Sequence, residues 1–149
     1  ESEYYKLNQS EGIVILPLTK KNELILIQQY RPCLKKKTIE FPAGSLEKKE
    51  TILNCAKREL LEETGYIARE WCSLGLFYPV PAYSDEVIHL FFARSLELKK
   101  SQCTDRGECI KLEEMGIENF LNEIENNKIL NILFTDYFSI LSGENMSLF

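Results

Sequence analysis

The chain has 149 residues, of which 23 are acidic and 18 are basic, so its formal net charge is −5. A chain of this length with 44% hydrophobic residues can bury a core without disulfides or a structural metal, which predicts a single domain over residues 1–149. The negative balance disfavours a nucleic-acid groove, because binding duplex phosphates requires clustered lysines and arginines.

No segment of the sequence predicts a membrane span or a secretion signal. The longest apolar runs, at residues 12–18 and 87–93, are far shorter than the roughly 20 residues that cross a bilayer. The five cysteines are odd in number and lack the two-residue spacing of zinc and redox sites, so we expect free thiols packed in the core. Together these features predict a cytoplasmic protein that does not bind membranes.

The first half of the chain predicts strands followed by one long helix. Strands are expected at residues 12–18, 23–29 and 38–41. A turn should follow the third strand at residues 42–44, where proline and glycine interrupt the extended pattern. From residue 51 to residue 64 there is no glycine or proline, and Gly65 stands where a left-handed helix cap is expected. This segment is therefore predicted to be a helix.

The second half predicts further strands and a second helix. Strands are expected at residues 71–78, 86–93 and 108–112. The loop at residues 79–85 contains two prolines, which should stiffen it. A helix should run from residue 113 to about residue 141. Short strands interleaved with a few helices predict an α/β (α+β) fold, in which a mixed central sheet lies between helices.

The predicted helix carries carboxylates on its buried face. With about 100° per residue and Ile52 set at zero, Glu63 projects at about 20°, inside the apolar stripe. Glu59 projects at about −20° and Glu62 at about −80°, so three carboxylates crowd the margin of the stripe. Carboxylates beside an apolar face repel one another and lose solvation, so a positive partner is expected there.

The sequence alone allows more than one source of this positive charge. Arg58 is four residues before Glu62 and can pair with it, which leaves Glu59 and Glu63 in need of a counter-charge. A divalent cation would supply that charge, and oxygen ligands without nearby histidine or cysteine favour Mg²⁺ or Mn²⁺. The alternative is a solvated acidic helix end whose charges pair with lysines.

The wider segment resembles a known family motif. Gly44 is followed after five residues by Glu50, and after seven more by the run RELLEETGY at residues 58–66. This pattern resembles the Nudix hydrolase box at all seven of its fixed positions. The resemblance implies a Nudix-type α/β/α sandwich and hydrolysis of a nucleoside diphosphate linked to another moiety.

The resemblance also implies roles for the helix residues. Arg58 would orient the glutamates, Glu59 and Glu63 would be metal ligands, and Glu62 would be a ligand or would support one. Attack of water on a diphosphate builds charge on phosphate oxygens, and a metal ion both clamps those oxygens and lowers the pKa of the water. Glu63 and Arg58 are thus catalytic candidates, and Mg²⁺ is the expected cofactor, with Mn²⁺ as the alternative.

Segments outside the box are similar to the ADP-ribose pyrophosphatase branch of the family. Upstream, QQYRP at residues 28–32 and EFPAG at residues 40–44 match its pattern. The match implies that Arg31 reaches the substrate and that the Ala43 carbonyl serves as a metal ligand. Downstream, Pro81 stands where ADP-sugar hydrolases carry a proline, although the next residue is alanine rather than the commoner glycine.

Two later carboxylates complete the implied site. Glu86 would contact the ribose region of the substrate, and the alternative is a plain carboxylate at the start of a strand. The DRGE segment at residues 105–108 is similar to a mobile loop whose glutamate acts as the catalytic base. Glu108 is therefore the candidate base and Asp105 the reserve, the alternative for Glu108 being an exposed glutamate without a role.

The sequence thus predicts a metal-dependent hydrolase that splits ADP-ribose, or a related nucleoside diphosphate sugar, into AMP and a sugar phosphate. Its partner would be that small molecule, and the branch implies a homodimer. The alternatives are hydrolysis of GDP-sugars or dinucleoside polyphosphates, and a Nudix module that senses nucleotide without cleaving it. The intact set of Glu59, Glu62 and Glu63 weighs against a pure binder, which needs no full metal cluster.

Overall fold

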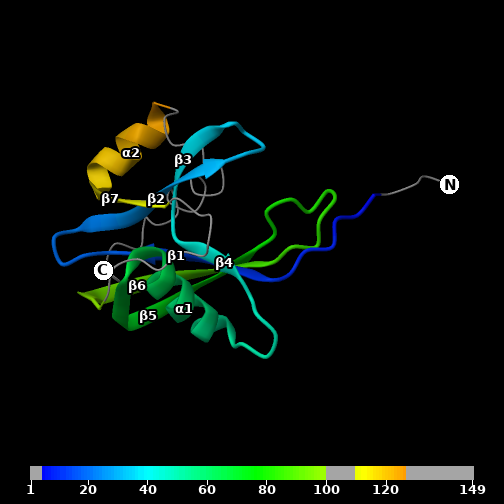
Figure 1. The fold of residues 1–149 in the computed structure, drawn as a ribbon, viewed down its shortest axis with the longest axis horizontal. Coiled ribbons are helices and arrows are strands. Elements are labelled where there is room, and N and C mark those ends of the chain that lie inside the picture. The colour runs from blue at the N-terminus through cyan, green and yellow to red at the C-terminus, as the bar shows by residue number, and fades with distance from the viewer. Residues whose placement is uncertain (1–4, 100–109, 127–149) are drawn as a thin grey trace.

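The computed structural model describes residues 5–99 and 110–126 of the chain (Figure 1). Its helices and strands are, in chain order, β1 (Gly12–Pro17), β2 (Glu23–Arg31), β3 (Lys36–Glu40), β4 (Ala43–Ser45), α1 (Ile52–Thr64), β5 (Tyr66–Phe77), β6 (Ile88–Leu98), β7 (Lys111–Gly116) and α2 (Ile117–Glu125). Runs of consecutive strands are therefore each followed by one helix, which is the element order of an α+β protein.

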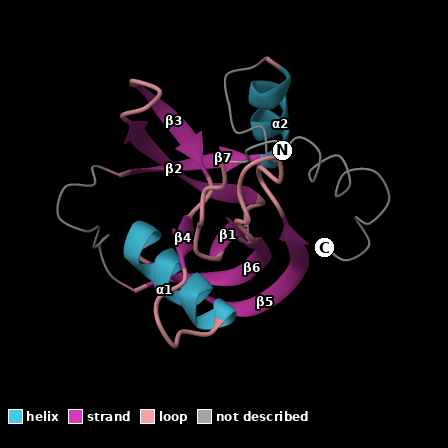
Figure 2. Cartoon of the chain, turned by 90° about the vertical axis from the view of Figure 1, so that its right-hand side faces the viewer, coloured by secondary structure: helices cyan, strands magenta, loops and turns pink. Residues whose placement is uncertain are grey.

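The strands form two sheets, one mixed and one antiparallel. The larger has the order β4-β1-β6-β5, in which β1 runs parallel to β6 while the other pairs are antiparallel. The smaller has the order β3-β2-β7 and is antiparallel throughout. α1 lies against the larger sheet and α2 lies beside β7 of the smaller one (Figure 2). The expected α+β fold with a mixed sheet is confirmed, and its strands divide between two sheets.

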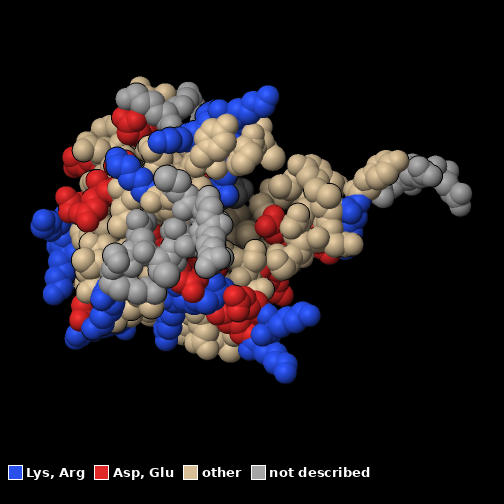
Figure 3. Space-filling view, in the orientation of Figure 1, with Lys and Arg blue, Asp and Glu red and all other residues tan. Residues whose placement is uncertain are grey.

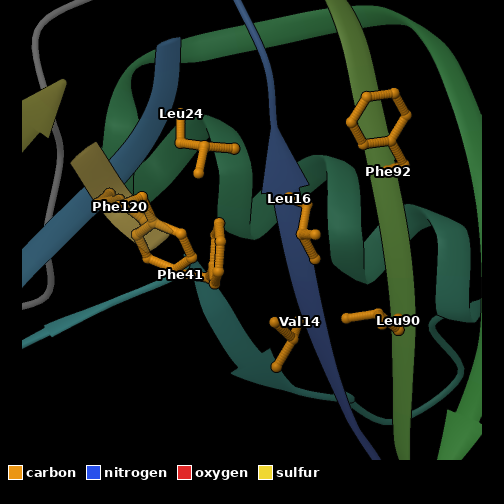
Figure 4. Packing of buried hydrophobic residues seen from close by; sticks show 8 residues of the cluster. Val14, Leu16, Leu24, Phe41, Leu90, Phe92 and Phe120 are labelled. Atoms are coloured by element: carbon orange, nitrogen blue, oxygen red, sulfur yellow. The ribbon is translucent and has the colours of Figure 1, made fainter. Parts of the chain in front are cut away.

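β1 lies between two hydrophobic cores, which explains its uninterrupted apolar sequence. Its side chains alternate between the two faces of the sheet. The core between the two sheets and α2 contains Val14, Leu16, Leu24, Leu26, Phe41, Leu90, Phe92 and Phe120 (Figure 4). The core between the larger sheet and α1 contains Ile13, Ile15, Cys55, Ala56, Leu60, Phe91 and Ala93. Packing on both faces fixes β1, and with it the edge strand β4, relative to α1.

α1 begins and ends where the sequence predicts. The side chain of Thr51 caps the first turn by accepting a hydrogen bond from the Asn54 N–H at 3.3 Å. Gly65 has the left-handed φ of 75°, and its N–H donates to the Leu61 carbonyl. In the described part of the chain, no helix is long and apolar enough to cross a membrane.

β7 replaces the beginning of the expected second helix. Residues 113–116 were expected to be helical, but they pair with β2, for example Glu114 with Ile25. Pairing with a distant strand outweighs the helix propensity of these glutamates, because strand formation depends on neighbours in space. α2 therefore begins only at Ile117. Residues 108–109 of the expected strand, and the expected helix beyond residue 126, lie outside the described residues.

Three further differences from expectation span more than two residues. β5 begins at Tyr66 rather than at residue 71, and β6 continues to Leu98 rather than ending at residue 93. The two strands form a long antiparallel pair, so each extends the other by hydrogen bonding. Residues 43–45 form β4 instead of a turn, because they pair with residues 12–14 of β1.

The described cysteines are free thiols in contrasting surroundings. Cys55 is buried as expected, and burial is the main cause that raises the pKa of its thiol to about 12. Cys33 and Cys72 are exposed, so the expectation that they pack in the core is wrong. Cys33 lies in the exposed turn between β2 and β3, and Cys72 is an exposed residue of β5, which also packs Trp71 against the core. Cys103 and Cys109 lie outside the described residues.

Candidate active site

A cleft of about 510 Å³ opens where β1, β2, β4, α1 and the start of β6 meet. Its polar and charged lining residues are Gln29, Arg31, Ser45, Arg58, Glu59, Glu62, Glu63 and Glu86, and the Ala43 and Gly44 backbone completes the wall. The molecule is visibly hollowed beside the loop that joins β5 to β6 (Figure 3). Most of the residues that the sequence singled out are therefore gathered in one place.

Arg58 binds several oxygen acceptors on the side of the cleft formed by α1 and β4, here called the α1 wall. Its Nε and Nη2 donate to both carboxylate oxygens of Glu50, at 3.0 and 2.9 Å. Its Nη1 donates to Glu59 at 2.7 Å and to Glu62 at 3.2 Å. The expected pair with Glu62 is confirmed. The expectation that Arg58 leaves Glu59 without a protein partner is wrong, because one guanidinium fork reaches both carboxylates.

Gly44 allows β4 to approach the Glu59 side chain. A Cβ atom at position 44 would lie 1.9 Å from Oε1 of Glu59 and 2.1 Å from its Cδ. These distances are far below van der Waals contact, so a side chain there would displace the carboxylate. The α1 wall therefore depends on glycine for close approach of the backbone, which is a common use of this residue.

Glu63 is a buried carboxylate beside the backbone of β4. It is 9% exposed, and its Oε2 accepts a hydrogen bond from the Ala43 N–H at 3.0 Å. Its position within the buried stripe of α1 agrees with the helical projection. Ala43 and Glu63, which the sequence pattern assigned to one metal site, are thus direct neighbours.

The α1 wall has more carboxylates than cations. Burial is the largest cause that raises the pKa of Glu59, and the charges of Glu62 and Glu50 raise it further, although Arg58 lowers it. The hydrogen bond from Arg58 lowers the pKa of Glu50, and the same carboxylates raise the pKa of Arg58. A single guanidinium serves several acids here, so the wall attracts a further positive charge.

The donor set of the α1 wall fits a hard divalent cation. It consists of the carboxylates of Glu59, Glu62 and Glu63 and the backbone of Ala43, and the described lining includes no histidine or thiol. Within residues 5–99 and 110–126, no group of three or more acidic, histidine or cysteine side chains is arranged to hold a metal ion. The carboxylates of Glu59 and Glu62 accept hydrogen bonds from Arg58, and that of Glu63 accepts one from the Ala43 N–H.

Arg31 lies at the end of β2, on the side of the cleft here called the β2 wall. Its Nε and Nη2 donate to the two oxygens of Glu40, at 2.8 and 2.5 Å. Glu40 also accepts a hydrogen bond from Oγ1 of Thr38. Burial raises the pKa of Glu40, but the hydrogen bonds from Arg31 and Thr38 and the Arg31 charge together lower it below its ordinary value.

The loop of residues 78–87, here called the projecting loop, extends from the body of the molecule beside the N-terminal segment (Figure 1). The Leu7 N–H donates to the Tyr83 carbonyl at 2.7 Å and so joins the two segments. Glu86, at the base of the loop, lines the cleft. Pro81 is exposed in the turn farther out and is not among the described residues that line the cleft.

Sequence reasoning missed several parts of this site. Gln29 could have been found, because alternation along a strand places it on the same face as Arg31. The clamp on Arg31 by Glu40 depends on the register between β2 and β3, and the contact of Arg58 with the Ser45 carbonyl depends on the approach of β4. Neither has a local sequence signal. The candidate bases Glu108 and Asp105 lie outside the described residues.

The sequence matches the family model described as the NUDIX domain over residues 9–134. This chain belongs to the Nudix family. The Nudix chain is 34% identical over 119 residues to an ADP-ribose pyrophosphatase of Bacillus subtilis, and 36% identical over 119 residues to a methanol dehydrogenase activator of Bacillus methanolicus. Each alignment covers 79% of this Nudix chain and 64% of the relative.

A GDP-mannose pyrophosphatase of Escherichia coli is 31% identical to the Nudix chain over 110 residues, which cover 70% of this chain and 56% of the relative. A crystal structure of an ADP compounds hydrolase superposes with a TM-score of 0.70 at 24% identity, covering 77% of this chain and 61% of that one. The latter likeness shows the shared fold. The predicted Nudix membership and the likeness to ADP-ribose pyrophosphatases are confirmed, and the Nudix chain spans less than two thirds of the length of these relatives.

Proposed function

We propose that this Nudix protein is a pyrophosphohydrolase that cleaves the diphosphate bond of ADP-ribose, or of a related nucleoside diphosphate sugar, into AMP (NMP) and a sugar phosphate. The observation that carries the proposal is one cleft lined by the carboxylates of α1 and by the guanidinium of Arg31. A diphosphate substrate uses both, because its oxygens need a cation and fixed N–H donors. The identity with the B. subtilis ADP-ribose pyrophosphatase supports ADP-ribose.

We propose Mg²⁺, with Mn²⁺ as the alternative, as the cofactor. The groups that would hold it are the Ala43 carbonyl and the carboxylates of Glu59, Glu62 and Glu63, since hard cations prefer oxygen ligands. When bound, such an ion neutralises charge on the diphosphate oxygens and lowers the pKa of the attacking water. Arg58 positions Glu59 and Glu62 through its hydrogen bonds.

Substrate recognition is assigned to Arg31, Glu86 and Pro81. Arg31 would bind the diphosphate, since a guanidinium donates to two phosphate oxygens at once. Glu86 would accept hydrogen bonds from the ribose hydroxyls, and its place on the cleft lining supports this role. Pro81 would act from outside the cleft by stiffening the projecting loop, because a proline fixes φ.

The proposed catalytic carboxylates are Glu63 in the cleft and Glu108, with Asp105 in reserve, as the general base. A general base takes the proton of the attacking water and typically contributes about 10²–10⁴-fold to the rate. Glu108→Gln should therefore lower kcat by about 10²-fold while KM changes by less than about threefold. An unchanged kcat for Glu108→Gln together with a loss for Asp105→Asn would transfer the role to Asp105.

We further propose one domain over residues 1–149 that acts in the cytoplasm as a homodimer, on a small nucleotide sugar rather than on nucleic acid or a membrane. The family match over residues 9–134 supports one domain. Exposed apolar side chains on and beside the projecting loop, such as Tyr5, Leu7 and Tyr83, support a dimer, because grouped exposed apolar side chains mark interfaces. Light scattering tests the dimer, and a monomer mass overturns it.

The decisive experiment is Mg²⁺-dependent phosphate release, coupled through a phosphatase, from ADP-ribose, ADP-glucose, GDP-mannose and diadenosine polyphosphates. We expect the highest kcat/KM on ADP-ribose and no release without a divalent ion. Preference for GDP-mannose would place the protein with the E. coli relative instead. Tight nucleotide binding without turnover would favour a non-catalytic sensor, and the B. methanolicus relative, named as an activator, gives that alternative its support.

A further inference from the structure

Glu40 and Thr38 lie on the same face of the smaller sheet as Arg31. In the β2–β3 register, Arg31 is opposite Lys36, Gln29 is opposite Thr38 and Ile27 is opposite Glu40. Glu40 on β3 is therefore level with Ile27, which precedes Arg31 by four residues on β2. The Arg31 side chain extends along this face toward Ile27 to reach Glu40. The three side chains form a chain of hydrogen bonds in which Thr38 donates to Glu40 and Glu40 accepts from Arg31.

The two ends of the ion pair differ in burial. The side chain of Glu40 is 13% exposed, whereas that of Arg31 is 44% exposed. An ion pair with one exposed partner contributes little to the stability of a protein. Two parallel hydrogen bonds to a planar guanidinium, however, fix the direction in which the group faces. The largely buried carboxylate of Glu40 is thus the fixed end, and the arginine at the cleft is the end that is oriented.

We propose that Glu40 is a positioning residue that acts through Arg31, holding its guanidinium at the cleft in the orientation that receives the diphosphate of the substrate. The inference rests on the proposed function of Arg31 and deepens it. A long arginine side chain has many rotamers, and ordering it during binding weakens affinity. Glu40 removes that cost in the free protein, because Nε–H and one N–H of Nη2 are already engaged in a fixed geometry.

A purely structural role for Glu40 makes a different prediction. If the carboxylate only tied β3 to β2, its loss would lower the melting temperature and leave substrate binding intact in the molecules that remain folded. A positioning role raises KM and leaves kcat nearly unchanged, because the interaction is made in the ground state and in the transition state alike. It also requires Arg31, so the effect of Glu40 must vanish when Arg31 is absent.

The test is a double-mutant cycle with Glu40→Gln, Arg31→Ala and the double variant, measured by turnover of ADP-ribose and by calorimetric titration of α,β-methylene ADP-ribose. Glutamine keeps the size of the side chain but removes the charge and the bidentate acceptor. We expect Glu40→Gln to raise both KM and the Kd of the analogue about tenfold, as for loss of one charge-assisted contact. In the Arg31→Ala background the same change should have less than about a twofold effect.

The matched control is Glu97→Gln, which removes another carboxylate that is paired with an arginine on a strand. Glu97 binds Arg69 at 3.1 Å on the surface of the larger sheet and does not line the cleft. Its variant should keep the wild-type KM and Kd. An unchanged or lower KM and Kd for Glu40→Gln, or an equal effect with and without Arg31, would overturn the positioning role.

The two proposals fail in distinguishable ways. If the wild-type protein binds the methylene analogue but cleaves no diphosphate, the proposed hydrolase activity fails, and the cycle on Kd still decides the role of Glu40. If the wild-type protein neither binds the analogue nor cleaves ADP-ribose, both proposals are overturned. Turnover by the wild-type protein with no Glu40 effect overturns the positioning role alone.

Discussion

Glu59 lines the cleft on the α1 wall, whereas Glu40 binds the cleft residue Arg31, and the pKa values of the two carboxyls shift in opposite directions. Both side chains are mostly buried, at 14% and 13% exposure, and each accepts hydrogen bonds from an arginine. The pKa of Glu59 is raised, whereas that of Glu40 is lowered. Glu59 shares Arg58 with Glu50 and Glu62, while Glu40 binds Arg31 through both of its oxygens and Thr38 as well.

The difference separates two kinds of paired carboxylate. On the β2 wall one guanidinium, that of Arg31, binds one carboxylate, that of Glu40, so the effect of the ion pair is to orient a side chain. On the α1 wall the single guanidinium of Arg58 serves several acids, so negative charge remains in excess where we propose that a cation binds. An arginine beside a carboxylate is therefore not by itself a sign of a balanced ion pair. The number of acids that share the arginine determines whether negative charge remains in excess.

The largest expected effect is on the α1 wall at Glu63. Glu63→Gln should lower kcat/KM by about 10²–10³-fold, because one electrostatic contact to the reacting centre is lost. Glutamine can still accept the hydrogen bond from the Ala43 N–H, so the melting temperature should stay close to that of the wild-type protein. Steady-state kinetics with a thermal melt checks both expectations. Wild-type turnover in this variant would refute the metal assignment of the α1 wall.

A smaller loss of activity is expected when the approach of β4 to α1 is blocked. Gly44→Ala places a methyl group where the Glu59 carboxylate now lies, so kcat/KM should fall by about 10–100-fold, as for loss of support to a metal ligand. Gly116→Ala is the matched control, because a Cβ there meets no atom within 4 Å and its φ is −60°. Equal activity in the two variants would show that the Glu59 position is not important.

Addition of Mg²⁺ should stabilise the protein through the α1 wall alone. A ligand that binds only the folded state at about 100 times its Kd adds about 2.7 kcal/mol, which corresponds to a rise of roughly 5–10 °C in melting temperature for a chain of this size. Differential scanning calorimetry with and without EDTA measures the rise. The Glu59→Gln variant should lose most of this rise in melting temperature, and the Glu40→Gln variant should keep it. The reverse result would indicate that Mg²⁺ binds at the β2 wall instead of the α1 wall.

The smallest expected effect is the opposite pH dependence of stability at Glu40 and Glu59. The folded-state pKa of Glu40 is lowered, so its ionised form contributes stability above its ordinary value of 4.5, and this contribution is lost as the pH falls through the folded-state pKa. The folded-state pKa of Glu59 is raised, so its ionised form lowers stability at neutral pH, and this cost disappears in acid.

Without metal at about pH 7, Glu40→Gln should therefore lower the free energy of unfolding, whereas Glu59→Gln should raise it, each by less than about 1 kcal/mol. Both differences should be smaller at about pH 3, where a larger fraction of each carboxylate is protonated than at about pH 7, and the change should be greater for Glu59, whose pKa is raised, than for Glu40, whose pKa is lowered. Urea denaturation at the two pH values measures them. If both variants changed the free energy of unfolding in the same direction at neutral pH, the contrast between Glu40 and Glu59 would be wrong.

The sequence was sufficient for the helix side of the site. The apolar period of α1 places Glu63 inside the buried stripe and Glu59 at its margin, and both predictions agree with the structure. Spacing along one helix is local information, so the pair of Arg58 with Glu62 could be predicted as well. The additional bonds of Arg58 to Glu50 and to the Ser45 carbonyl could not, because they cross from the helix to preceding segments.

The features that could not be predicted from the sequence depend on strand pairing. The bond between Arg31 and Glu40 depends on the β2–β3 register, which no short pattern specifies. Glu113, Glu114 and Met115 are good helix formers but pair with β2, about 90 residues earlier in the chain. The error at β7 and the missed clamp on Arg31 therefore have one cause, since both depend on which strands lie next to β2.

The position of β1 between both cores has a consequence for how the protein unfolds. Alternate side chains of this one strand belong to different cores, so if either core loses its order, β1 loses the packing on that face. The two layers are thereby coupled into one cooperative unit. Fluorescence of Trp71, which packs on the α1 side, should report the same denaturation midpoint as circular dichroism of the whole chain. The cleft has walls from both layers, so it forms or is lost together with the entire fold.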